Sequence, residues 1–108
     1  MTLKQLQTMV HHNAKEHGWW DDNRALPELI ALVHSELSEA LEEYRKGFDP
    51  DHAYYQEDGK PEGVPSELAD VIIRVLDMAE YYGIDMEKIV LEKHNYNMKR
   101  PYKHGKKL

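Results

Sequence analysis

Residues 35–41 read Ser-Glu-Leu-Ser-Glu-Ala-Leu, and residues 66–72 read Ser-Glu-Leu-Ala-Asp-Val-Ile. Each copy carries two carboxylates three residues apart: Glu36 with Glu39, and Glu67 with Asp70. Positions i and i+3 fall on one face of a helix, so each copy predicts a helix with a carboxylate pair on one side. Two such helices packed side by side would bring four carboxylates to one place.

Four converging carboxylates repel one another unless a cation lies among them. At ~4 Å and an effective dielectric constant near 20, each like-charged pair costs roughly 4 kcal/mol. Oxygen ligands favour Mg²⁺ or Mn²⁺, and we therefore expect Mg²⁺ to be held by Glu36, Glu39, Glu67 and Asp70. Glu43 lies one turn further along the same face, and it is either a fifth ligand or outer-shell base, or a solvated acid at the helix end.

The alternative is that these residues are ordinary surface acids. Glu and Asp are common on helices, and an isolated like-charge pair costs only about 0.2–0.5 kcal/mol. Two such pairs in nearly identical heptapeptides favour the metal site. Di-iron bundles use a Glu-x-x-His spacing, which is absent here, and the seven histidines include no His-x-x-x-His pair. His11 and His12 are better interpreted as partly buried or surface side chains than as ligands.

The composition predicts a single globular domain over residues 1–108. Hydrophobic residues make up 41% of the chain and charged residues 31%, which argues against disorder. There is no cysteine, so disulfides, thiol catalysis and cysteine-ligated zinc are excluded. No apolar run approaches the ~20 residues of a membrane helix, and the first residues lack the apolar segment of a secretory signal. We expect a cytoplasmic protein without a membrane partner.

The net charge of −6 is unevenly distributed. Residues 93–108 contain six basic residues and no acidic ones, which leaves 8 basic and 20 acidic residues in the rest of the chain. A basic tail, at about residues 99–108, is by itself compatible with a solvated or nucleic-acid-contacting end. The acidic body argues against stable nucleic-acid binding, because phosphate contacts dominate such affinity. An acidic body with a basic tail suits an anionic ligand that arrives with metal ions.

Start and stop signals predict an all-α fold of four helices with no strands. Thr2 and Gln5 form a capping-box pattern, and Asp85 is the cap of the last helix. Glycines and prolines mark the other ends, and the predicted helices span about residues 2–17, 27–46, 65–83 and 85–99. The polar stretch that contains Tyr54 and Tyr55 is long enough to act as a lid or a dimer contact.

The second and third helices each carry one apolar stripe on a helical wheel. In the second helix the stripe consists of Leu29, Val33, Leu37, Ala40, Leu41 and Tyr44. In the third helix it consists of Leu68, Val71, Ile72, Val75, Met78, Ala79 and Tyr82. The carboxylate pairs lie along one edge of each stripe, so an antiparallel pair of helices with a shared core would bring the acidic edges together. A core this thin would gain from oligomerisation.

A phosphate ester would need basic side chains as well as metal ions, because the chain has no Walker-type glycine loop. Lys93 and Asn97 are i,i+4 on the last helix, and Arg100 is three residues further, so one face presents a cation, an amide and a guanidinium. A solvated helix end is the alternative, because positive charge is favoured there in any case. Trp19 and Trp20 are able to stack a base, although such residues more often belong to the core.

The acidic repeat and the end of the chain together resemble the MazG-like nucleotide pyrophosphohydrolases. In this chain Glu36-x-x-Glu39, a 27-residue gap and then Glu67-x-x-Asp70 resemble the metal motif of that family. Residues 93–105 are similar to a tail of its small single-domain members. The resemblance covers about residues 26–108. One departure is Ser35, where the family often has a further glutamate; the four metal positions are intact.

The resemblance implies a four-helix MazG-like bundle, completed by oligomerisation as a homodimer or tetramer with sites formed partly across subunits. It also implies Mg²⁺-dependent hydrolysis of a nucleoside triphosphate to the monophosphate and pyrophosphate, with Mn²⁺ as a substitute metal, in nucleotide-pool housecleaning. Glu39 by preference, and Glu36 or Glu43 otherwise, would orient or deprotonate the attacking water.

The remaining expected contacts are to the substrate. Lys93 and Arg100 would hold phosphate oxygens, Asn97 and Tyr102 the sugar or a phosphate, and Trp19 a wall of the base pocket. Two other functions stay open at this point. One is a non-catalytic helical dimer with a regulatory or scaffold role, in which the acids are solvated. The other is a nucleic-acid binder that works through the basic tail.

Overall fold

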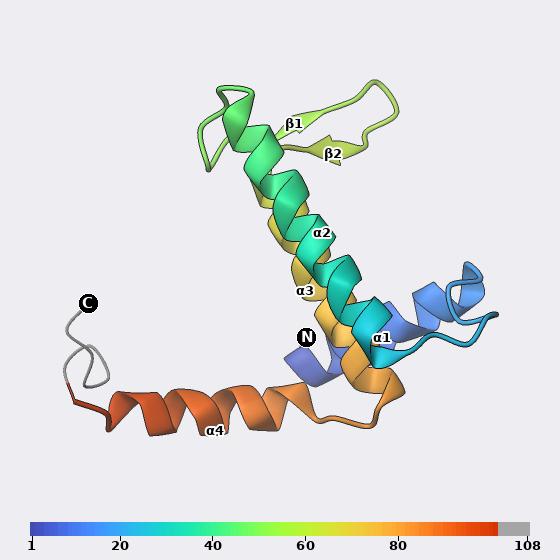
Figure 1. Cartoon of the computed structure of the whole chain (residues 1–108), viewed down its shortest axis with the longest axis vertical. Coiled ribbons are helices and arrows are strands. Elements are labelled where there is room, and N and C mark those ends of the chain that lie inside the picture. Colours follow the sequence, from blue (N-terminus) through green and yellow to red (C-terminus); the bar gives the residue numbers. More distant parts are fainter. Residues whose placement is uncertain (102–108) are drawn as a thin grey trace.

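The computed structural model describes residues 1–101, and helices dominate it (Figure 1). They are α1 (Leu3–Glu16), α2 (Leu26–Arg45), α3 (Val64–Tyr81) and α4 (Met86–Met98). The prediction of a helical fold with four helices is confirmed in this part of the chain. Tyr102 and the tail that follows it lie outside the described residues. Within residues 1–101, no helix combines the length and apolarity required to cross a membrane.

The predicted helix starts agree with the structure to within one residue, because the signals that start a helix, a capping side chain or a proline in the first turn, act locally. The Thr2 hydroxyl accepts a hydrogen bond from the Gln5 backbone N–H at 3.1 Å, and the Gln5 side chain accepts one from the Thr2 N–H at 2.8 Å. This completes the predicted capping box. The Asp85 side chain accepts from the Lys88 N–H at 3.1 Å at the start of α4, and Pro27 lies in the first turn of α2.

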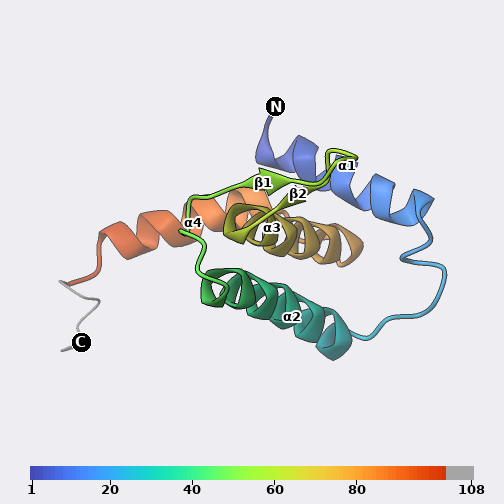
Figure 2. The same ribbon diagram turned by 90° about the horizontal axis from the view of Figure 1, so that it is seen from above.

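The central helix is α3 (Figure 2). Antiparallel to it runs α2, and α1 packs against another side of α3. Gln7 ties α1 to the end of α3, because its Nε2 donates to Glu80 Oε1 at 3.0 Å and to the Ile84 carbonyl at 2.8 Å. In Figure 1, α4 runs away from the α2–α3 pair. The two carboxylate-bearing helices are therefore neighbours, whereas the last helix extends from one end.

Between α2 and α3 lies a short antiparallel ribbon of β1 (Tyr54–Tyr55) and β2 (Pro61–Glu62). The expectation of no strands is therefore wrong at this point. The hairpin is closed by the Gln56 N–H, which donates to the Lys60 carbonyl at 2.9 Å. Strands of two residues are too short to show alternation of apolar and polar side chains, so the sequence pattern carries no signal for them. The ribbon places Glu62 opposite Tyr54, next to the start of α3.

The face of α2 that meets α3 carries carboxylates as well as apolar side chains. Its buried residues follow the helix period at i, i+7, i+11 and i+14, and they are Leu29, Glu36, Ala40 and Glu43. The predicted apolar stripe is therefore partly wrong, because three of its members are exposed: Leu37, Leu41 and Tyr44. The physical reason is that two carboxylates take up the inner face, so the larger apolar side chains point outwards.

A single chain leaves much of its apolar surface uncovered. On α3, Leu68 and Ile72 of the predicted stripe are exposed as well, and no side chain among residues 1–101 is fully buried. The Cα radius of gyration is 16.4 Å, compared with about 13 Å for a compact chain of this length. The chain is thus elongated and its core is small.

Gly63 joins β2 to α3, and its substitution tests the ribbon. Its φ is +104°, and a Cβ at this position would lie 2.5 Å from the His52 carbonyl oxygen. Gly63→Ala is expected to lower the melting temperature more than Gly59→Ala, where φ is +88° but the surrounding space is open. The Gly59 variant carries only the backbone cost of roughly 1–2 kcal/mol. Thermal unfolding by circular dichroism measures both, and equal effects would contradict the close approach.

Candidate functional site

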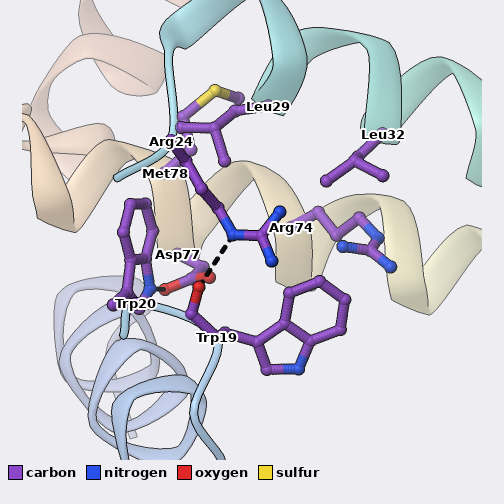
Figure 3. A pocket seen from close by; sticks show the side chains of 8 residues that line it. All are labelled: Trp19, Trp20, Arg24, Leu29, Leu32, Arg74, Asp77 and Met78. Carbon is purple, nitrogen blue, oxygen red and sulfur yellow. Dashed lines mark hydrogen bonds between the residues drawn. The ribbon is translucent and has the colours of Figure 1, made fainter. Parts of the chain in front are cut away.

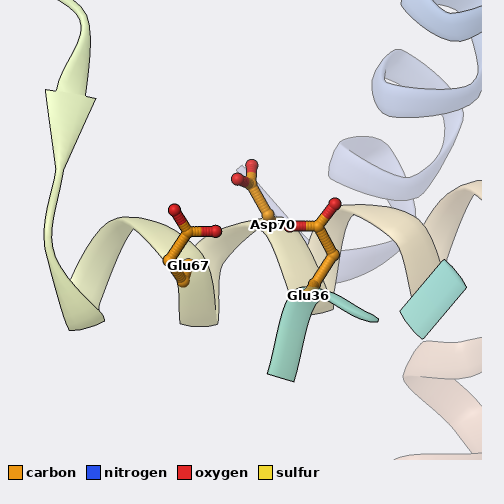
Figure 4. Close-up of side chains that lie close together, drawn as sticks. All are labelled: Glu36, Glu67 and Asp70. Atoms are coloured by element: carbon orange, nitrogen blue, oxygen red, sulfur yellow. The ribbon is translucent and has the colours of Figure 1, made fainter. Parts of the chain in front are cut away.

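Three carboxylates from two helices meet between α2 and the first two turns of α3 (Figure 4). Glu36 of α2 and Glu67 and Asp70 of α3 each offer one oxygen, and these oxygens lie within 4.8 Å of one another. Glu67 and Asp70 share a face of α3 because they are three residues apart, and Glu36 reaches across from α2 toward them. The structure thus brings three of the four predicted metal ligands to within 4.8 Å of one another, and the fourth, Glu39, interacts with this group through Glu67.

Glu39, the fourth predicted ligand, lies at the edge of this cluster on an exposed part of α2. Burial, a hydrogen bond with Glu39, and repulsion from Glu39, Asp70 and Glu36 raise the pKa of the Glu67 carboxyl from 4.5 to about 7. Burial, followed by the charge of Glu36, also raises the pKa of Asp70. Without a bound cation, the cluster relieves its repulsion by keeping a proton near neutral pH.

A second group of carboxylates lies next to this cluster, on the side of the β1–β2 ribbon. Oxygens of Glu43, Glu62 and Glu67 also lie within 4.8 Å of one another. Glu43 is only 5% exposed, and it accepts hydrogen bonds from the Tyr54 hydroxyl at 3.0 Å and from Lys46 Nζ at 3.4 Å. The alternative of a solvated acid at Glu43 is therefore wrong. Glu62 was missed by sequence reasoning, because it comes from the ribbon and belongs to no motif.

The donor set fits a hard divalent cation. All candidate ligand atoms are carboxylate oxygens, which Mg²⁺ and Mn²⁺ prefer. Glu67 Oε2 is buried and has no hydrogen-bond partner among residues 1–101, and an oxygen in that state is costly unless something binds it. A cation between Glu36, Glu67 and Asp70 would satisfy this oxygen and neutralise the repulsion together.

Arg74 of α3 contacts the carboxylate cluster, and the sequence motifs did not predict this. Its Nε donates to Glu36 Oε1 at 2.6 Å, and its guanidinium lies 4.7 Å from the centre of the Trp19 ring. The signal in the sequence is a polar face on α3 with spacing i, i+3, i+7 and i+10, formed by Glu67, Asp70, Arg74 and Asp77.

A cleft of about 350 Å³ adjoins the carboxylates, which lies within the size range of small-ligand pockets. Its lining includes Glu36, Asp70, Arg74, Trp19 and His17. Of the two tryptophans, the one predicted to wall a base pocket therefore lines the same cleft as two of the candidate metal ligands. Carboxylates, a guanidinium and an indole ring meet in this one space.

Trp20 belongs instead to the packing between the first loop and α3 (Figure 3). Its ring stacks on Tyr81 with the centroids 4.2 Å apart, and its Nε1 donates to Asp77 Oδ1 at 2.9 Å. His11 Nδ1 lies 2.7 Å from the same oxygen, so His11 is a partly buried side chain with a structural partner. The cavity drawn in Figure 3 measures about 20 Å³, room for about one water molecule.

The predicted phosphate-binding residues of α4 do not join the carboxylates within one chain. Lys93 and Asn97 line a separate groove along α4, and the cations of Lys93 and Arg100 lie 5.2 Å and 5.9 Å from the centre of the Tyr96 ring. The turn after α3 directs α4 outwards (Figure 1), which keeps the two groups apart. Tyr102 lies outside the described residues.

The raised pKa of Glu67 predicts how stability depends on pH. Between about pH 4.5 and 7 the folded chain holds a proton on Glu67 that the unfolded chain has lost, so the contribution of this group to stability falls as the pH rises through that window. Glu67→Gln removes this titration. Its gain in melting temperature over the wild type should grow from about pH 5 to about pH 8, and millimolar Mg²⁺ should reduce it.

Thermal melts across this pH range measure the effect. Glu42→Gln is the matched control, because Glu42 lies on the same helix as the cluster but is exposed and pairs with Arg45 at 3.1 Å. A difference between Glu67→Gln and the wild type that stays constant with pH would contradict the shifted pKa.

Comparisons with known proteins assign no family to the chain. No family model matches it, and no curated protein and no solved structure matches it. What this chain does has therefore to be inferred from the carboxylate cluster, the cleft and the side chains that line them.

Proposed function

We propose that the chain is a Mg²⁺-dependent nucleoside triphosphate pyrophosphohydrolase of the MazG-like kind, which hydrolyses an NTP or dNTP to the monophosphate and pyrophosphate. The observation that carries the proposal is the meeting of Glu36, Glu67 and Asp70 beside a cleft, with a buried oxygen of Glu67 left unpartnered among residues 1–101. The repeated acidic motif and the basic tail support the same family. Nucleotide-pool housecleaning is the role that goes with this activity.

The carboxylates have two roles in this proposal: three are ligands of the metal ion, and one is the general base. When bound, Mg²⁺ supplies positive charge that neutralises triphosphate oxygens and stabilises the charge developed during hydrolysis. Glu36, Glu67 and Asp70 would hold this ion. Glu39 would accept the proton of a water whose oxygen attacks the α-phosphorus, and the bond from that phosphorus to the α,β-bridging oxygen would break and release pyrophosphate. Glu39 suits this role better than Glu36, because Glu39 faces solvent at the edge of the cluster whereas Glu36 is buried and already bound by Arg74.

The cleft offers a place for the nucleoside. Trp19 lines this cleft and is 41% exposed, and an indole ring offers an aromatic surface against which a base can pack. The volume of about 350 Å³ is at the lower end of the range for small-ligand pockets. The base would then lie against Trp19, and the triphosphate would extend toward the carboxylates.

A homodimer or tetramer is the second part of the proposal. Leu37, Leu41 and Tyr44 of α2 are 47%, 57% and 58% exposed, and burial of such apolar surface drives association. A neighbouring copy would complete the bundle. It would also bring the predicted phosphate- and sugar-binding residues to the site from its own α4 and tail, namely Lys93, Asn97, Arg100 and Tyr102.

A panel of NTPs and dNTPs with Mg²⁺ tests the activity. The expected products are monophosphate and pyrophosphate, separated by anion exchange, and EDTA should stop their formation. Glu67→Gln should lower kcat by at least about 100-fold, as the loss of a group that stabilises the transition state does. Glu42→Gln should leave turnover unchanged, because this exposed side chain pairs with Arg45 outside the cluster.

Other results of the panel would redirect the proposal. Diphosphate and phosphate as products would keep the metal site and overturn the point of cleavage. No turnover by a folded protein, together with a stable oligomer, would favour the non-catalytic helical dimer. Salt-dependent binding of duplex nucleic acid would favour a nucleic-acid binder that works through the basic tail.

The oligomer has its own test. Leu41→Glu places a charge on the exposed apolar side of α2 and should shift the protein towards the monomer in sedimentation velocity. Met9→Glu is the control, because Met9 is similarly exposed at 54% but lies on α1. A wild-type chain that sediments as a monomer at micromolar concentration would contradict the proposed assembly.

A further inference from the structure

We propose that Arg74 couples the candidate metal site to an anionic substrate. Its guanidinium neutralises Glu36 while no cation is bound, competes with a divalent cation that arrives alone, and contacts a phosphate oxygen of a substrate that arrives with the cation. The inference rests on the proposed function, because it concerns the same site. It adds a phosphate-binding group on the same chain as the carboxylates, which neither the acidic motif nor the basic tail contains.

The contact between Arg74 and Glu36 is short and sheltered. Nε donates to Oε1 at 2.6 Å, and the two side chains are 25% and 8% exposed. A hydrogen bond between an ionised donor and an ionised acceptor at this distance is among the strong ones. A carboxylate as buried as Glu36 is costly without a positive partner. Arg74 thus supplies the positive charge that Glu36 needs before any cation binds.

Arg74 also faces the cleft. Its guanidinium lies over the Trp19 ring at 4.7 Å, and both residues line the cleft together with Asp70. A guanidinium has five N–H donors, and Glu36 is its one hydrogen-bond partner among residues 1–101. The flat fork of donors matches the spacing of phosphate oxygens. A phosphate in the cleft would therefore meet a donor already held in place by Trp19 and Glu36.

A cation bound at the carboxylates and the Arg74 guanidinium repel each other unless an anion lies between them. A divalent cation held by Glu36, Glu67 and Asp70 would lie near the guanidinium, because Arg74 already contacts one of the three ligands. Like charges at such short range repel, and more so in a partly buried site. A triphosphate oxygen attracts both of them. Cation and anion therefore raise each other's affinity, and this coupling is reciprocal.

Binding of Mn²⁺ and of tripolyphosphate, measured by calorimetry without turnover, tests the proposal. Arg74→Gln should bind Mn²⁺ alone about tenfold more tightly than the wild type, a difference of about 1.4 kcal/mol. At saturating Mn²⁺ the same variant should bind tripolyphosphate about tenfold more weakly. Tripolyphosphate is the probe because it reports phosphate binding independently of the base.

Arg24→Gln is the matched control. Arg24 also lies over the Trp19 ring, at 5.2 Å, but its Nε donates to the Trp19 carbonyl at 2.8 Å and its ion pair is with Glu28 at 3.4 Å. Its replacement should leave the Mn²⁺ affinity unchanged. A tenfold gain in Mn²⁺ affinity in both variants would show a general charge effect and overturn the specific role of Arg74.

The remaining outcomes separate this inference from the proposed function. Mn²⁺ binding by the wild type that is unchanged or weakened in Arg74→Gln would overturn the inference and leave the metal site standing. Absence of Mn²⁺ binding in the wild type and in both variants would overturn the proposed metal site, and the inference with it.

A measurement on the wild type covers the case in which Arg74→Gln does not fold. The Nε–Hε signal of Arg74 can be followed by ¹⁵N NMR while Mg²⁺ and then tripolyphosphate are added. It should move from its Glu36-bound position when Mg²⁺ binds, and move again with tripolyphosphate. A signal that stays in place through both additions would overturn the proposal.

Discussion

Repulsion between buried carboxylates is the constraint on which the rest of this structure depends. Glu36 and Glu43 of α2 face Glu67 and Asp70 of α3, where a pair of helices would ordinarily pack apolar side chains. Charges interact more strongly there than in water, so the cluster needs protons, cations or basic side chains. Three observations follow from that need: the raised pKa of Glu67, its Oε2 without a hydrogen-bond partner in the described part of the chain, and the contact of Arg74 with Glu36.

The same constraint shapes the packing. Because carboxylates take up the inner face of α2, side chains such as Leu41 and Tyr44 point outwards and the core of one chain stays small. The hydrophobic effect acts on the apolar area that remains in water, and a chain that buries acids between its helices leaves more of that area exposed. A partly polar interior and an exposed apolar surface on α2 are thus two sides of one arrangement, and α4 extends away from the α2–α3 pair (Figure 1).

Much of the candidate site could be predicted from the sequence, and the exceptions have physical reasons. The pair of Glu67 and Asp70 could be predicted because the period of a helix puts positions i and i+3 on one face. Arg74 was not singled out, although it lies on that face, because a lone basic residue in a helix carries no motif. Glu62 could not be predicted from the sequence, because it lies on a two-residue strand whose pairing partner is set by the fold of the loop.

The sequence by itself determined the four helices, their starts, and the carboxylate pair on each of two helices. All of these depend on contacts within a few residues, such as the Thr2–Gln5 capping box. Only the tertiary structure decided that Glu43 is buried, that Glu39 lies at the edge of the cluster and that Arg74 binds Glu36. These outcomes depend on how far each helix is rotated about its own axis against its neighbours, and that rotation is set by the packing of the whole chain.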